Sequence, residues 1–253
     1  MKLSQLRRHW DRFARTDPYW AVLTEPDKQH SRWALDEFFA TGVATIDAEL
    51  ARVRARHPGL RPGRALDFGC GVGRLTQALA RHFDAVVGVD LSGEMIALAR
   101  RHIAAGARVE FVHNLRPDLR VFPDARFDFV CSLLTLQHLE PRHARFYIAE
   151  FLRVCAPGGA VLFQLPTRTK PRDPPERLDF SFWPPTLWMR TRRYVRYHAA
   201  RAFPRGPVME MHALPQDEVL ALLRALGAEV LDVWPDAATD PAIGSNSYLA
   251  RKS

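Results

Sequence analysis

Short apolar runs alternate with amphipathic stretches through the middle of the chain. The runs are four to eight residues long, whereas the stretches between them repeat apolar positions with the spacing of a helix. Runs of nearly continuous apolar residues are typical of parallel strands covered by helices on both faces. We therefore expect an α/β core with right-handed crossovers. The apolar runs are 65–68, 85–89, 109–112, 127–134 and 160–165, and the helical stretches are 73–83, 93–103 and 144–154.

The first 60 residues have helical periodicity instead. Apolar side chains recur at Leu3, Leu6, Trp10 and Phe13, and a longer apolar series follows from Trp33 to Val53. Proline and glycine at positions 58 and 59 would end the last of these helices. The pattern predicts an N-terminal helical extension over residues 1–60.

The chain changes character again after the fifth apolar run. Residues 166–213 contain eight prolines and many aromatic residues, which predicts an insertion. Residues 214–253 return to a regular pattern, with a helix capped by Gly227 and two strands near 228–234 and 245–251. The predicted parts are thus an extension (1–60), a core (61–165), an insertion (166–213) and a C-terminal helix and strands that complete the sheet (214–253).

The length and composition suit one large domain with additions. No segment approaches the roughly 20 apolar residues of a membrane span, and the first residues lack the apolar stretch of a secretory signal. Cys70, Cys131 and Cys155 lie far apart, without the paired spacing of a zinc site or a redox dithiol. We expect a cytoplasmic protein without a metal.

A glycine-rich turn follows the first strand of the core. Gly69, Gly71 and Gly73 come between a strand and a helix, where open α/β sheets bind ligands. A dinucleotide fingerprint would require a glycine at position 74, which is Arg74. Asp67, two residues before the first glycine, is poorly suited to a diphosphate and favours a ligand with an ammonium group. The turn therefore favours a cationic cofactor over NAD.

A second acid follows the next strand. Asp90 directly follows the run 85–89, about 20 residues after the turn, where a carboxylate can accept both hydroxyls of a ribose. The strings D-F-G-C-G-V-G and V-D-L-S-G-E-M-I-A-L-A resemble the first two motifs of class I S-adenosylmethionine-dependent methyltransferases. The resemblance covers residues 64–165. It implies a Rossmann-like, doubly wound, mostly parallel seven-stranded sheet with an antiparallel last strand.

The same resemblance implies a cofactor and the residues that hold it. The cofactor would be S-adenosylmethionine, released as S-adenosylhomocysteine. The loop from Asp67 to Gly73 would hold the methionyl part, Asp90 the ribose, and Leu91 with Met95 the adenine. Asn114 stands where an acid is often found, before Leu115, and would recognise the adenine edge. The predicted cofactor-binding residues are Asp67, Gly69, Cys70, Gly71, Gly73, Asp90, Leu91, Met95, Asn114, Leu115 and Leu133.

The residues after the fourth strand bear on the chemistry. Ser132-Leu133-Leu134 stands where enzymes that methylate bases or glutamine carry Asn/Asp-Pro-Pro-Tyr, and no carboxylate for magnesium precedes Glu140. His138 is therefore the candidate general base, since a neutral imidazole can take a proton from a hydroxyl or an amine. The alternative is that His138 packs beneath the cofactor or caps the helix from Pro141.

The insertion is the candidate substrate reader. Between Pro166 and Gly206 there are nine arginines and one lysine against three acids, within a chain of net charge +8. An arginine-rich cap favours a carboxylate- or phosphate-bearing acceptor, either free or presented on a carrier; the alternative is that these arginines are solvated or form internal ion pairs. The candidate substrate-binding residues come from this cap and the N-terminal extension: Tyr19, Trp20, Tyr194, Tyr197, His198 and His212.

Four functions follow from these patterns. The first is transfer of a methyl group from S-adenosylmethionine to the oxygen or nitrogen of a small molecule. The second is RNA methylation, disfavoured because no separate RNA-binding module is visible. The third is cyclisation of S-adenosylmethionine with release of methylthioadenosine, and the fourth is adenosyl binding without catalysis or an NAD-dependent reaction. The sequence predicts no particular oligomeric state.

Overall fold

The computed structural model describes residues 2–103, 108–168, 207–236 and 244–253. The central element is a seven-stranded sheet of order β3-β2-β1-β4-β5-β7-β6. The first five of these neighbours pair in parallel, whereas β7 is antiparallel to both β5 and β6. The strands are β1 (Arg64–Phe68), β2 (Ala85–Asp90), β3 (Val109–His113), β4 (Phe127–Ser132), β5 (Cys155–Pro166), β6 (Ala228–Pro235) and β7 (Ser245–Lys252). The predicted fold class and the antiparallel last strand are confirmed.

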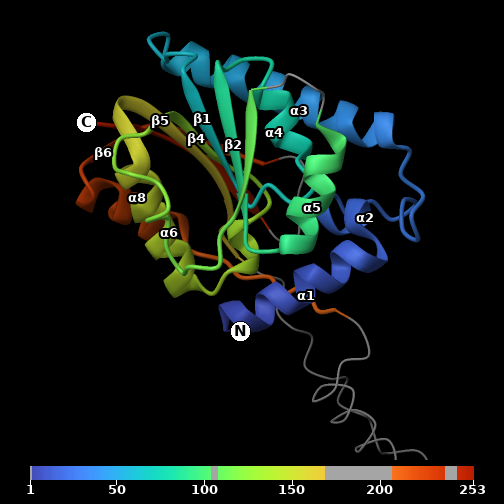
Figure 1. Ribbon diagram of the computed structural model, residues 1–253. Helices are drawn as coiled ribbons and strands as arrows, with labels where there is room; N and C mark the ends of the chain where they lie inside the picture. The colour runs from blue at the N-terminus through green and yellow to red at the C-terminus, as the bar shows by residue number, and fades with distance from the viewer. Residues whose placement is uncertain (1, 104–107, 169–206, 237–243) are drawn as a thin grey trace, which may run out of the picture.

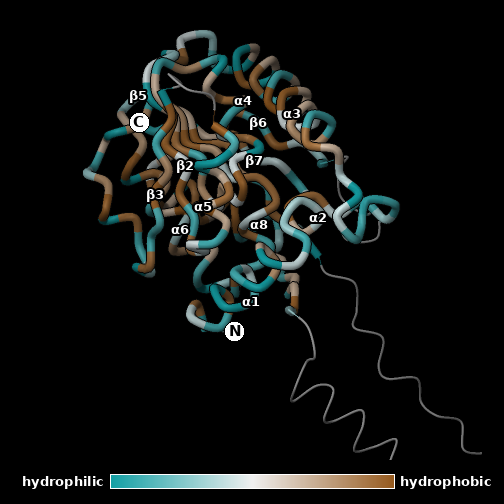
Figure 2. Tube along the Cα trace, turned by 45° about the vertical axis from the view of Figure 1, so that its right-hand side comes forward, coloured by the Kyte–Doolittle hydropathy of each residue, from teal (hydrophilic) through white to brown (hydrophobic). Residues whose placement is uncertain are grey.

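Helices cover both faces of this sheet (Figure 1). One face packs against α3 and α4 through a cluster that includes Leu50, Leu79 and Phe129, and the other packs against α6 and α8 through Phe151 and Leu223. The helices of the core are α3 (Leu35–Arg56), α4 (Arg74–Leu79), α5 (Gly93–His102), α6 (Pro141–Val154) and α8 (Gln216–Ala225), with a short 3₁₀ helix η1 (Leu136–His138). Figure 2 shows the apolar colour concentrated on the strands between these layers.

The N-terminal extension reaches the end of the sheet where the parallel strands finish. Helices α1 (Leu3–Thr16) and α2 (Pro18–Val22) lie beside α5 at that end (Figure 1). Asp11 accepts a hydrogen bond of 2.7 Å from the Ser92 hydroxyl, and Arg15 pairs with Glu94 at 2.8 Å. Phe13 packs in a cluster with Phe38 and Met95. The extension thus contacts the core at the edge where a ligand would lie.

Two further findings concern the chain as a whole. Among the helices in the described ranges, none is long and apolar enough to cross a membrane. Most of the predicted insertion, residues 169–206, lies outside the described residues. The division into extension, core, insertion and C-terminal part stays a prediction.

Candidate active site

The glycine-rich loop connects β1 to α4 with three residues of positive φ. Gly69, Gly71 and Gly73 have φ values of 74°, 52° and 85°. Residues other than glycine rarely adopt positive φ values. At Gly69 there is also no room, because a Cβ would stand 2.2 Å from Cγ2 of Thr135. The loop therefore lies directly against the turn that follows β4.

Asp90 connects this loop to the end of β2. One carboxylate oxygen accepts a hydrogen bond of 2.9 Å from the Gly71 amide, and the other accepts one of 2.7 Å from the Ser92 amide. Burial raises the pKa of Asp90, while these backbone hydrogen bonds lower it. Each oxygen keeps a second lone pair. The arrangement can therefore accept hydroxyl donors from a ligand while holding the loop in place.

A cavity of about 150 Å³ opens beside Asp90. It lies at the carboxyl ends of β1 and β2, and α1 closes it from the other side through Leu3, Ser4 and Arg7. Five of the predicted cofactor residues supply its walls, with Leu115 60% exposed at the rim: Gly69, Asp90, Leu91, Asn114 and Leu115. We refer to this space as the loop cavity. Its other lining residues are Phe68, Val89, Arg116, Thr135, Leu139 and Tyr147.

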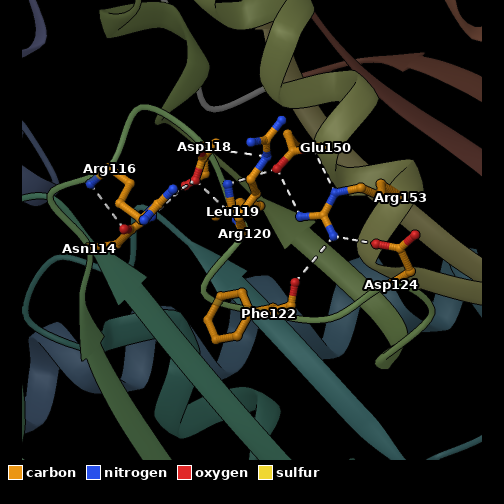
Figure 3. A network of polar contacts seen from close by, with 9 residues as sticks. All are labelled: Asn114, Arg116, Asp118, Leu119, Arg120, Phe122, Asp124, Glu150 and Arg153. Atoms are coloured by element: carbon orange, nitrogen blue, oxygen red, sulfur yellow. Dashed lines mark hydrogen bonds and ion pairs between the residues drawn. The ribbon is translucent and has the colours of Figure 1, made fainter.

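Asn114 uses its side chain to shape the wall of the loop cavity. Its Nδ2 donates to the Asp118 carbonyl at 2.6 Å, and its Oδ1 accepts from the Arg116 amide at 3.1 Å. The segment that follows is tied to α6, since the Leu119 amide donates to Glu150 at 2.8 Å (Figure 3). Asn114 thus has its amide engaged in the segment, which leaves its backbone and one face toward the cavity.

Other predicted cofactor residues lie beneath the loop. Asp67 is 2% exposed and accepts a hydrogen bond of 2.6 Å from the Thr76 hydroxyl; burial raises its pKa to about 6. Cys70 packs against Ile96 and Phe111, and Met95 lies in the cluster of Phe13 and Phe38. Gly73 begins α4. The residues Asp67, Cys70, Gly73 and Met95 line neither this cavity nor the second one described below, and support the loop from within.

His138, the candidate base, lies in η1 and is buried. Its Nδ1 donates to the Glu210 carbonyl at 2.8 Å, its Nε2 lies 3.3 Å from the Gln137 amide nitrogen, and its ring packs edge-on to Trp10. Burial lowers the pKa of His138 to about 4, so the imidazole is neutral at pH 7. It lines neither cavity.

The candidate substrate residues are dispersed. The Tyr19 hydroxyl lies 2.9 Å from Nε2 of His102, and Nε1 of Trp20 donates to the Glu25 carbonyl at 3.1 Å. His212 lies 3.2 Å from the Glu210 carboxylate. None of these three lines the loop cavity or the second cavity described next. Tyr194, Tyr197 and His198 lie outside the described residues.

A second cavity of about 370 Å³ lies at the carboxyl ends of β4 and β5. Leu133 and Leu134, which follow β4, and Gln164 of β5 form its floor, and Arg74 lies between it and the glycine loop. We call it the strand-end cavity. The turn after β4 contributes to both cavities, since Leu134 lines one and Thr135 the other. Its walls come from α3, from the segment between α2 and α3 and from the ends of β6 and β7: Leu23, Glu25, Asp27, Lys28, Trp33, Glu37, Thr41, Thr45, Glu49, Asp236 and Ser247.

Sequence reasoning missed several residues of these cavities. Arg7 could have been found, because it lies one helical turn from Leu3 on the same face of α1. Thr135 carries no sequence signal, since only the folded loop brings it to Gly69. Glu49 stands on a helix whose sequence pattern indicates only packing, and its place in a cavity depends on β6 and β7. Among the described residues no group of three or more metal-ligating side chains occurs.

The fold and the loop define a class of protein: a Rossmann-like sheet with a glycine loop and an acid at the end of β2. Residues 65–159 match the family model described as "Methyltransferase domain". The chain thus contains a methyltransferase domain, and its fold is that of the class I S-adenosylmethionine-dependent methyltransferases. The match agrees with the predicted family, whose cofactor is S-adenosylmethionine.

Relatives of known name share part of the chain. A phosphatidylethanolamine N-methyltransferase from Cereibacter sphaeroides is 36% identical over 138 residues, which are 53% of this chain and 64% of that protein. A ubiquinone biosynthesis O-methyltransferase from Aromatoleum aromaticum is 33% identical over 110 residues, 43% of this chain and 46% of that protein. The chain thus spans less than two thirds of the length of these curated relatives.

Solved structures agree on the fold. Magnesium protoporphyrin IX methyltransferase from Synechocystis with bound S-adenosylhomocysteine superposes with a TM-score of 0.63 at 17% identity, covering 100% of both chains. An N-methyltransferase from Bradyrhizobium japonicum in complex with S-adenosylhomocysteine gives a TM-score of 0.60 at 15% identity, covering 97% of each. At these identities the likeness concerns the fold.

Proposed function

We propose that this protein transfers the methyl group of S-adenosylmethionine to an oxygen or nitrogen of a small molecule. The observation that carries the proposal is the Asp90 carboxylate at the rim of the loop cavity. It is held by the amides of Gly71 and Ser92 at 2.9 and 2.7 Å. An acid in this position, beside a positive-φ glycine loop without a third phosphate-type glycine, fits an adenosyl ribose better than a diphosphate.

The chain's own residues would bind, orient and exclude water. When bound, S-adenosylmethionine supplies a sulfonium-activated methyl group that needs no further activation. Asp90 would accept the ribose hydroxyls, Leu91 and Leu115 would flank the adenine, and α1 would cover the cofactor through Arg7. The turn from Leu133 to Thr135, between the two cavities, would align the acceptor with the methyl group. Alignment of this kind can supply much of the rate enhancement.

The surroundings of His138 favour the packing alternative over a role as general base. Nδ1 is committed to the Glu210 carbonyl, and Nε2 faces the Gln137 amide at 3.3 Å. A base with a pKa near 4 removes a proton from a hydroxyl or amine poorly. We therefore propose that His138 positions η1, and that proton removal does not depend on it.

The acceptor is the open part of the function. Of the two relatives, one is named an N-methyltransferase and the other an O-methyltransferase. An acidic or carrier-presented acceptor rests on the arginines of the insertion, nearly all of which lie outside the described residues. The cytoplasmic location and the small-molecule partner also stay proposals.

Cofactor binding is tested by calorimetric titration of S-adenosylmethionine, S-adenosylhomocysteine and NAD. We expect the two adenosyl ligands to bind and NAD to fail. Asp90→Ala should weaken the adenosyl ligands by about tenfold or more, as expected for loss of charge-assisted hydrogen bonds. Asp232→Ala, at a partly exposed ion pair with Arg56 away from both cavities, is the control. Unchanged affinity in Asp90→Ala would contradict the site.

Methyl transfer is tested by release of S-adenosylhomocysteine across a panel of small-molecule acceptors and an RNA sample. The proposal expects acceptor-dependent release with a small molecule. Methylthioadenosine formed without any acceptor would instead indicate cyclisation, and release only with RNA would indicate RNA methylation. Cofactor binding without any turnover would leave a binding protein.

A further inference from the structure

The strand-end cavity carries a charge opposite to that of the chain. Five carboxyl groups line it, from Glu25, Asp27, Glu37, Glu49 and Asp236, against two cationic side chains, Lys28 and Arg74. The whole chain has a net charge of +8. A cavity that is net negative within a basic protein is a local feature, not a reflection of composition.

Both cationic side chains of the cavity face other acids. Lys28 lies 2.6 Å from each carboxylate oxygen of Glu37. Arg74 is attracted by Asp67, which lies beneath the loop and outside the cavity lining. Glu49 is attracted by Arg52 of its own helix and repelled by Asp236. The lining therefore keeps an excess of negative charge that a cation would balance.

Within the described part of the chain, two buried polar atoms of the cavity lining have no hydrogen-bond partner. Oε2 of Glu49 is one, and Nε of Arg74 is the other. Arg74 is 4% exposed, and its terminal Nη1 already donates to the hydroxyls of Thr41 and Thr45 at 3.2 and 3.4 Å. A buried polar atom without a partner is costly. A ligand that offers a donor to Glu49 and an acceptor to Arg74 would satisfy both.

The cavity already contains the surroundings of an ammonium group. The Lys28 ammonium lies 5.0 Å from the centroid of the Trp33 ring while it pairs with Glu37. An aromatic face next to a carboxylate is the usual environment for binding an organic cation. The chain's own amine thus already occupies an aromatic and carboxylate environment at this wall of the cavity.

We propose that the strand-end cavity binds the methyl acceptor and that this acceptor is an amine which also carries an oxygen acceptor. The amine enters as a cation balanced by the carboxylates, Glu49 foremost, and its oxygen accepts from Arg74. The inference rests on the proposed methyl transfer. It is based on the position of the cavity at the carboxyl ends of β4 and β5, where the turn after β4 lines it with Leu134 and lines the loop cavity with Thr135.

The methyl transfer to such an amine conserves atoms and electron pairs. The ammonium first loses one proton, to water or to a carboxylate of the cavity, because a protonated nitrogen has no free electron pair. The nitrogen pair forms the new N–C bond to the methyl carbon, and the C–S bond breaks with its electron pair going to sulfur. The products are a methylated ammonium and S-adenosylhomocysteine.

The experiment compares matched acceptors with matched variants. Ethanolamine and phosphoethanolamine serve as amines with oxygen acceptors, and catechol and benzoate serve as hydroxyl and carboxylate acceptors. kcat/KM is measured from S-adenosylhomocysteine release for wild type, Glu49→Gln and Asp47→Asn. Asp47 lies on the same helix but outside the cavity lining, where it pairs with His82 at 2.6 Å. S-adenosylhomocysteine affinity and the thermal midpoint are measured for each variant to establish that it folds.

We expect methylation of an amine, with kcat/KM about tenfold lower or more in Glu49→Gln and changed less than about twofold in Asp47→Asn. The affinity for S-adenosylhomocysteine should be the same in all three proteins. If Glu49→Gln does not fold, Asp236→Asn replaces it with the same expectation. Methylation of catechol or benzoate alone would overturn the inference and leave methyl transfer intact. So would an amine kcat/KM that Glu49→Gln, or Asp236→Asn in its place, leaves unchanged. No turnover with any acceptor despite cofactor binding would overturn both.

Discussion

Close contact with the Thr135 side chain makes Gly69 the most demanding single residue of the loop. Its φ of 74° is matched by Gly158, whose φ is 73°, but a Cβ at Gly158 would meet nothing within 4 Å. At Gly69 the added carbon would stand 2.2 Å from Thr135. The two glycines therefore separate the cost of backbone strain from the cost of steric contact.

We expect Gly158→Ala to lower the free energy of unfolding by about 1–2 kcal/mol, the cost of a left-handed alanine. Gly69→Ala should cost clearly more and should also weaken S-adenosylhomocysteine binding, because the loop must move away from the turn after β4. Denaturant unfolding and calorimetry measure the two effects. Equal losses of stability with unchanged affinity would mean that the loop tolerates the contact.

The buried imidazole of His138 should make the free energy of unfolding depend on pH. Its folded-state pKa of about 4 lies below the ordinary value of 6.5. Between these values the unfolded chain binds a proton that the folded chain does not, so this residue stabilises the fold above pH 6.5 and loses that contribution as the pH falls toward 4. The difference corresponds to about 3 kcal/mol.

His138→Asn should therefore flatten the decline in unfolding free energy between pH 6.5 and 4, measured by denaturant titration at several pH values. His30→Asn, at an exposed residue of positive φ where asparagine is tolerated, is the matched control and should leave the decline unchanged. If His138 is instead the catalytic base, kcat of the variant should collapse at every pH while the stability profile stays the same.

At the scale of elements, the segment between β3 and β4 is held from α6. Glu150 accepts from the Leu119 amide at 2.8 Å and pairs with Arg153 at 2.7 Å, and Arg153 in turn bonds the Phe122 carbonyl and Asp124 (Figure 3). The Glu150 carboxylate is buried, so these bonds are screened little by water. The pair thus fixes the wall of the loop cavity beside Asn114 from a distance.

Glu150→Gln should lower the free energy of unfolding by about 1–3 kcal/mol, the range for hydrogen bonds to charged groups. Amide exchange at Leu119 should become faster, and S-adenosylhomocysteine affinity should fall moderately. Asp124→Asn removes an exposed partner of the same arginine, so it should change each quantity little. Equal effects of the two variants would show that the exposed contact matters as much as the buried one.

The elements themselves follow closely from the hydrophobic pattern, and their side-chain directions do not. The apolar runs predicted five of the seven strands because a buried parallel strand must be apolar on both faces. Asp90 was predicted to face the ligand and does line the loop cavity. Asp67 and Met95 belong to the two motifs as well, but Asp67 bonds Thr76 and Met95 packs with Phe13 and Phe38. Glu49 lines a cavity because residues at the ends of β6 and β7, about 180 residues later in the chain, form another wall of it.

At the scale of the whole molecule, the extension and the sheet form the loop cavity together. Helix α1 reaches across the strand ends, held by Leu6 in one core cluster and by Phe13 in another. Arg7 lines the cavity, and its Nε is buried without a hydrogen-bond partner among the described residues. The helix therefore offers an unused donor to whatever the sheet edge binds.

If α1 and the sheet edge bind the cofactor together, loss of the Arg7 side chain should weaken that binding. Arg7→Ala should weaken S-adenosylhomocysteine binding by about tenfold, because a charged donor is removed from the cavity. Arg8→Ala, at the exposed neighbour outside the cavity lining, should change the affinity less than about twofold. Bound S-adenosylhomocysteine should also slow amide exchange along α1 in wild type and less so in Arg7→Ala. Equal affinities in the two variants, with α1 exchanging alike with and without ligand, would mean that the sheet edge binds the cofactor alone.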